Sequence, residues 1–66
     1  MDKTRIHIIK RGDGWAIKKE GGLKASRVFD KKEDAEEHSR RYRNDGYDVI
    51  VHRKDGSIEK WEKAIG

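Results

Sequence analysis

Three histidines, His7, His38 and His52, are the side chains of this chain best suited to bind a metal ion or to transfer a proton. Strand pairing could bring His7 close to His52, but a metal site needs two or three such groups converging with carboxylates. The spacings of the histidines match no metal-binding motif. We therefore expect partly buried or surface histidines, with no bound metal and no other cofactor.

Hydroxyl groups and carboxylates give no stronger indication of catalysis. Ser26, Ser39 and Ser57 lie in no nucleophile elbow, and the chain has no cysteine. The carboxylates fall mostly in turns, caps and helical ion pairs, where solvation keeps them ordinary. A chain of 66 residues also has little volume for a pocket that excludes water. We expect no catalytic residue, no small-molecule substrate and no enzymatic activity.

Basic side chains are the clearest electrostatic feature of the chain, whose net charge is +4. Residues 1–33 hold ten Lys and Arg against five Asp and Glu, whereas residues 34–66 hold seven against eight. Clustered positive charge attracts polyanions such as nucleic acid. An ordinary solvated surface is the alternative, because Lys and Arg are mostly exposed in any protein. The candidate phosphate-binding residues are Lys18, Lys19, Lys24, Arg27, Arg40, Arg41 and Arg43.

The two tryptophans have different expected roles. Exposed aromatic rings beside basic residues can stack on unpaired bases. Trp15 alternates in phase with Ile17, and so small a core needs its largest apolar side chains, so we expect Trp15 to be buried. Trp61 lies near the end of the sequence and its exposure is left open. Together with Ile65 it is the candidate protein interface.

Alternating apolar and polar residues predict the strands, and a periodic charged segment predicts one helix. The expected strands cover residues 4–10, 15–19, 23–29, 47–53 and 57–61. Turns are predicted at Asp13-Gly14 and Asp55-Gly56, because Asp-Gly between alternating segments is typical of a hairpin.

The helix is expected to begin after Asp30, which would act as N-cap in a capping box with Glu33. Gly46 would follow its C-terminus. Its buried stripe would contain Ala35, His38 or Ser39, and Tyr42.

These elements predict an α+β fold of order β-β-β-α-β-β, with one antiparallel sheet and a single helix packed on one face. We expect one small domain over residues 1–66, with an ordered core at 4–61 and a tail at 62–66. The last strand should place Ile58 opposite the β-branched residues that precede the second turn.

Three segments together resemble a family of short bacterial and phage proteins that is catalogued only as a domain of unknown function. The segments are Gly14-Trp15-Ala16-Ile17-Lys18, then Ala25-Ser26-x-Val28-Phe29-Asp30 with Glu33 and Ala35, then Val51-His52-x-x-Asp55-Gly56-x-Ile58. The resemblance extends from about His7 to Ile58 and implies no known activity. The family's helix tends to be richer in alanine than this one, which carries Glu37, His38, Arg40 and Arg41.

Two hypotheses about function follow from these residues. The first is a small, basic, non-enzymatic module that binds nucleic acid, DNA or RNA, through its phosphate backbone. The alternative is a protein-interaction or self-associating regulatory module, a homodimer or a phage-encoded factor being special cases. No apolar segment is long enough for a signal peptide or a membrane span, so we expect a cytoplasmic protein without a membrane partner.

Overall fold

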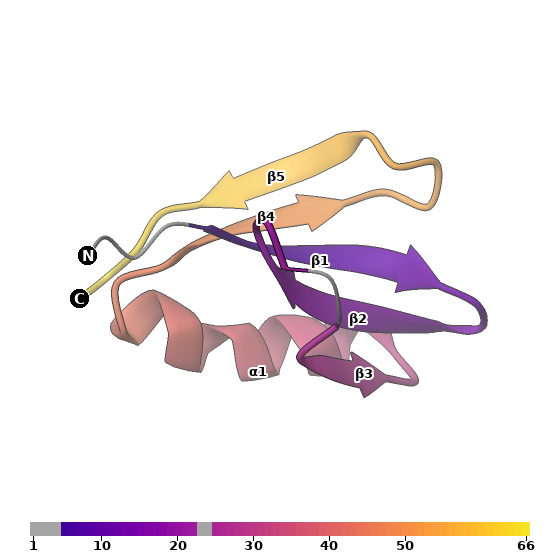
Figure 1. Ribbon diagram of the computed structural model, residues 1–66, viewed down its shortest axis with the longest axis horizontal. Coiled ribbons are helices and arrows are strands. Elements are labelled where there is room, and N and C mark those ends of the chain that lie inside the picture. The colour runs from indigo at the N-terminus through magenta and orange to yellow at the C-terminus, as the bar shows by residue number, and fades with distance from the viewer. Residues whose placement is uncertain (1–4, 23–24) are drawn as a thin grey trace.

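The computed structural model describes residues 5–22 and 25–66, which form five strands and one helix in the predicted order (Figure 1). The third strand is shorter than the predicted 23–29, and its first two positions, Leu23 and Lys24, lie outside the described residues. The elements are β1 (Arg5–Arg11), β2 (Gly14–Lys19), β3 (Arg27–Phe29), α1 (Lys32–Asn44), β4 (Asp48–His52) and β5 (Ile58–Glu62).

The strands form one sheet of order β3-β2-β1-β4-β5, and α1 lies along one of its faces (Figure 1). Three of the four pairings are antiparallel, but the central strands β1 and β4 run parallel. The expectation of an antiparallel sheet was therefore wrong at its centre. The reason is topological: parallel neighbours need a long crossover connection, and β2, β3 and α1 together supply it.

The core lies between the sheet and α1. Alternate apolar residues of the three central strands point toward the helix, and among them Ile8 on β1 and Ile17 on β2 are fully buried. Trp15 is only 8% exposed and belongs to the same cluster, as expected. The other buried members are Ile6, Ala35, Val49 and Val51.

Small side chains let α1 approach the sheet closely. Ala35 and Ser39 are both fully buried on the inner face of the helix. The Ser39 hydroxyl donates a hydrogen bond to the carbonyl of Glu36 (2.6 Å), so the buried polar group has a partner. Of the two alternatives for the middle of the stripe, Ser39 is the buried residue, and His38 lies at the margin with partly buried Tyr42.

The helix begins one residue later than its predicted start. Lys31 is the N-cap, in an extended conformation and without a side-chain capping bond. Glu33 is then the second residue of the helix rather than the third, so the capping box with Asp30 does not form. The end of the helix agrees with the prediction, because Gly46 follows it with a φ of 102°.

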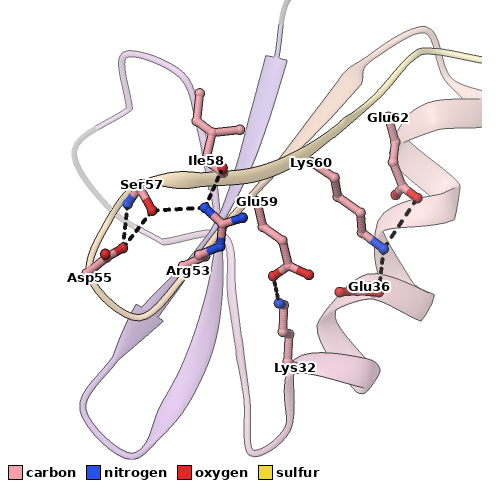
Figure 2. A network of polar contacts seen from close by, with 9 residues as sticks. All are labelled: Lys32, Glu36, Arg53, Asp55, Ser57, Ile58, Glu59, Lys60 and Glu62. Carbon is pink, nitrogen blue, oxygen red and sulfur yellow. Dashed lines mark hydrogen bonds and ion pairs between the residues drawn. The ribbon is translucent and has the colours of Figure 1, made fainter.

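The first hairpin turns one residue earlier than predicted. Gly12, not Gly14, has the positive φ of 58°, and the turn is centred on Gly12-Asp13. Gly14 instead opens β2, where a Cβ atom would collide with the carbonyl oxygen of Phe29 on β3. In the second turn Gly56 has the positive φ, as expected, and the Asp55 carboxylate accepts hydrogen bonds from the amide and hydroxyl of Ser57 (Figure 2).

Ion pairs connect β5 to the helix at the edge of the sheet. Lys32 pairs with Glu59, and Lys60 lies 3.4 Å from Glu36 (Figure 2). A register shift between Val51 and His52 pairs Ile58 with His52, and Ile58 is half exposed. Its predicted position opposite the β-branched residues was therefore wrong, because the shift places it beyond them.

The residues after β5 return to the end of α1. The backbone amides of Ile65 and Gly66 both donate to the carbonyl of Arg43 (2.8 and 3.1 Å). This docks the predicted tail on the C-terminal end of the helix, where carbonyl groups lack helical partners.

Candidate nucleic-acid interface

Four ring side chains form a row along one side of α1, which we call the aromatic row: Phe29, His38, Tyr42 and Tyr47. The ring centroids lie 5.4 Å apart between Phe29 and His38, 5.9 Å between His38 and Tyr42, and 5.8 Å between Tyr42 and Tyr47. All four residues are partly buried. The row arises because His38 and Tyr42 are one turn apart on the helix, while the end of β3 and the start of β4 bring the other two rings alongside.

Basic side chains from three elements flank the aromatic row. The Arg27 guanidinium lies 5.5 Å from the ring centre of Phe29, and the Lys19 ammonium lies 5.8 Å from that of Tyr47. Burial lowers the pKa of His38, and the positive charges of Arg27 and Arg41 lower it further. The neutral form of the His38 ring is therefore favoured, and a neutral ring can stack but adds no charge.

A surface hollow of about 420 Å³ lies at the Phe29 end of the row. Phe29, His38 and Arg41 line it together with Asp34 and Glu37. The two carboxylates reduce the positive potential here. At this end of the row, Arg41 lies among these carboxylates, and Arg27 lies beside the Phe29 ring.

The structure describes six of the seven predicted phosphate-binding residues and divides them among several surfaces. Lys19, Arg27 and Arg41 gather at the aromatic row, as the contacts above show. Arg40 and Arg43 instead line a hollow of about 330 Å³ with four glutamates, namely Glu33, Glu36, Glu37 and Glu62. Lys18 lies opposite His7 in the β1–β2 register, on the sheet face opposite α1. Lys24 lies outside the described residues.

The sheet face opposite α1, which we call the open face, holds a second polar cluster. His7 Nδ1 lies 2.9 Å from His52 Nε2, so strand pairing does bring these histidines together. His7 Nε2 lies 2.9 Å from Glu20, which also accepts a hydrogen bond from Arg5. The bond with His7 lowers the pKa of Glu20, and Arg5 lowers it further. Sequence patterns did not indicate Glu20, because it reaches the cluster through the β1–β2 register.

The two candidate interface residues occupy separate positions. Trp61 is 45% exposed at the rim of the open face, where its indole donates to Asp48 (3.0 Å) and Arg5 lies 5.3 Å from its ring centre. Ile65 is 62% exposed beside the end of α1. In residues 5–22 and 25–66, no group of three or more histidine or carboxylate side chains could hold a metal ion.

Sequence reasoning also missed the aromatic row as a unit. The signal that could have found it is the i, i+4 spacing of His38 and Tyr42, with Phe29 just before the helix and Tyr47 just after it. Those flanking rings can reach the helical pair only if β3 and β4 lie on the same side of α1, which depends on the sheet order.

The fold and the site define a small α+β domain with a basic, aromatic side. The chain belongs to an uncharacterized family of proteins conserved in bacteria, DUF2188, whose model matches residues 6–62. This confirms the resemblance to a domain of unknown function.

A curated relative, the uncharacterized protein YdaT of Bacillus subtilis (strain 168), is 40% identical over 61 residues. The match covers 91% of this chain but only 40% of that protein. No solved structure matches the chain. Within the part of the chain that the structure describes, no helix has the length and apolar character to cross a membrane.

Proposed function

We propose that this domain is a non-enzymatic, cytoplasmic module that binds single-stranded nucleic acid along the aromatic row. Bases would stack on the exposed parts of the rings, while phosphates would pair with Lys19, Arg27 and Arg41. The observation that carries the proposal is that these three basic residues, which come from three elements, flank one continuous row of rings.

We expect this binding to have modest affinity and little sequence preference. Stacking is tolerant of sequence because every base has a π face. Three phosphate contacts would give a slope of about −2 for the logarithm of the association constant against the logarithm of the salt concentration. Asp34 and Glu37 limit the affinity further, so binding should be strongest at low ionic strength.

Two neighbouring arginines provide a matched test. Arg41 contributes to the aromatic row, whereas Arg40 lies in the glutamate-lined hollow, although both are exposed residues of the same helical turn. Fluorescence anisotropy would measure binding of labelled oligo(dT) and oligo(U) strands at several salt concentrations. We expect Arg41→Gln and Arg27→Gln each to reduce the salt slope by about 0.7, and Arg40→Gln to leave it nearly unchanged.

A ring substitution separates stacking from charge. Phe29→Leu keeps an apolar side chain at the end of the row but removes the aromatic face. We expect a loss of about 5-fold in affinity, corresponding to about 1 kcal/mol of stacking, with the salt slope unchanged. Absence of binding at low salt, or equal losses for the Arg40 and Arg41 variants, would contradict the proposal.

The exposed apolar side chains favour a second candidate function, which is self-association or binding of a protein partner. Trp61 and Ile58 on β5 and Val28 on β3 are 45–59% exposed. These residues lie on opposite edge strands, so pairing at one edge would cover only part of them. Sedimentation over a range of concentrations tests this: a dimer that persists in moderate salt supports it, and a monomer throughout counts against it.

A further inference from the structure

Two histidines on the central parallel strands face each other across the open face. The inner nitrogens, Nδ1 of His7 and Nε2 of His52, are 2.9 Å apart. Each outer nitrogen has its own partner. Nε2 of His7 lies 2.9 Å from a carboxylate oxygen of Glu20, and Nδ1 of His52 lies 2.9 Å from the carbonyl oxygen of Gly56.

These partners determine where the ring protons lie. A carbonyl oxygen can only accept, so Nδ1 of His52 must carry a proton. The Glu20 carboxylate pairs with Arg5 in its ionised form, and an ionised carboxylate can only accept hydrogen bonds. Nε2 of His7 must therefore donate to it. If both rings are neutral, the inner nitrogens are then two lone pairs directed at each other. Only a cation between them makes this contact favourable, and that cation is either a proton or a metal ion.

We propose that His7 and His52 form a binding site for a divalent transition-metal ion, which takes the place of the shared proton. Histidines that ligate metals almost always donate their other ring nitrogen to a carboxylate or a backbone carbonyl, and both of these partners are present here. Tetrahedral coordination at about 2.0–2.1 Å would separate the inner nitrogens to roughly 3.3 Å, which requires only a small movement of the rings. Water would complete the coordination, because the His7 side chain is 23% exposed.

The surrounding charges set limits on this site. Imidazole nitrogen favours Cu²⁺, Ni²⁺ and Zn²⁺ over Mg²⁺ and Ca²⁺. Lys18 pairs with His7 across the strands and Arg5 lies beside Glu20, so both oppose a cation that Glu20 attracts. With two protein ligands, the affinity must be lower than that of a closed structural zinc site.

Isothermal titration of the untagged 66-residue chain with NiCl₂ and ZnCl₂ tests the proposal. We expect saturable binding of one ion per chain, weakened at least 10-fold in His7→Gln and in His52→Gln. His38→Gln is the matched control, because His38 lies on the other side of the sheet and should leave binding unchanged. Glu20→Gln should weaken binding by roughly 10–100-fold, as expected for a group that orients a ligand. Circular dichroism establishes that each variant is folded.

A second measurement uses the unaltered protein and so does not depend on the folding of any variant. Nitrogen-15 spectra of the histidine rings should show Zn²⁺ shifting Nδ1 of His7 and Nε2 of His52, while the outer nitrogens stay protonated. The proposal is wrong if no saturable binding occurs, if binding survives in both His7→Gln and His52→Gln, or if His38 is the ring that shifts.

Discussion

The Asp48 carboxylate, at the start of β4, connects the segment after β5 to the sheet. The backbone amide of Ala64 donates to one of its oxygens (2.8 Å), and the Trp61 indole donates to the other (3.0 Å). These two bonds, with Lys63 and Arg5 nearby, hold the pKa of Asp48 below its ordinary value of 3.8. The charged carboxylate is therefore favoured in the folded state over the unfolded chain.

Substitution of Asp48 should change how stability depends on pH. Since the pKa is lower in the folded state, the stabilisation is complete above the unfolded value of 3.8 and is lost as the pH falls through the folded pKa. Asp48→Asn should lower the urea midpoint at pH 6, and its difference from the parent should shrink toward pH 2. Asp13→Asn, in the exposed first turn, is the control that removes the same charge. A constant difference at all pH values would contradict this.

The start of α1 is a weak point that one substitution can repair. Lys31 occupies the N-cap without a side-chain bond and adds a positive charge at the positive end of the helix dipole. We expect Lys31→Asp to stabilise the protein by about 1 kcal/mol, because its carboxylate can accept from the free amides of the first turn. Lys31→Ala removes the charge without supplying a cap. Equal thermal midpoints for these two variants would show that no capping bond forms.

The contact between β2 and β3 depends on a glycine that is not in a turn. Gly14→Ala should destabilise the protein by about 1–3 kcal/mol, because its Cβ meets the backbone of Phe29. Gly12→Asn is the comparison, since Asn tolerates a positive φ and a Cβ at Gly12 meets no atom within 4 Å. Chemical denaturation of both variants measures the difference. A larger loss for the Gly12 variant would place the constraint in the turn instead.

Sequence patterns predicted where the strands and the helix lie better than they predicted how the strands pair in the sheet. Alternation located every strand to within a few residues, and the Trp15 phase was right, because local periodicity reports burial directly. The parallel pairing of β1 with β4 depends on contacts between distant segments, which periodicity does not contain. The basic residues of the site could be identified from the sequence by their type. Which of them lie at the aromatic row could not, because that depends on how the helix is oriented on the sheet, which places Arg40 and Arg41 on different surfaces.

Across the described residues, the three surfaces differ in their charged side chains, although Glu37 lines the hollows of two of them. The aromatic row has basic neighbours, the hollow beside β5 is rich in glutamate, and the open face combines histidines with Glu20 and Arg5. The glutamates repel a polyanion, so it should approach the molecule from the side of the aromatic row. This preference arises although the net charge is only +4. The proposed metal site and the proposed nucleic-acid surface therefore share no residue.

The core is so small that shortening a single buried side chain should measurably lower the free energy of unfolding of the whole protein. A chain of 66 residues is expected to have a free energy of unfolding of roughly 3–10 kcal/mol, and a composition with only 32% hydrophobic residues favours the lower part of that range. Ile8 is fully buried on β1, between β2 and β4, so its side chain contributes to the contacts of the sheet centre with the helix.

We expect Ile8→Val to cost about 0.5–1.5 kcal/mol and Ile8→Ala about 2–5 kcal/mol, since the alanine variant leaves the larger cavity between the sheet and α1. The valine variant should remain folded at 25 °C, whereas the alanine variant should be substantially unfolded in circular dichroism spectra. The exposed Ile65→Ala is the control and should change stability by less than about 0.5 kcal/mol. A fully folded Ile8→Ala protein would mean that this sheet has a larger stability reserve than its apolar content provides, and association between copies through the exposed edge strands would then be the first source to measure.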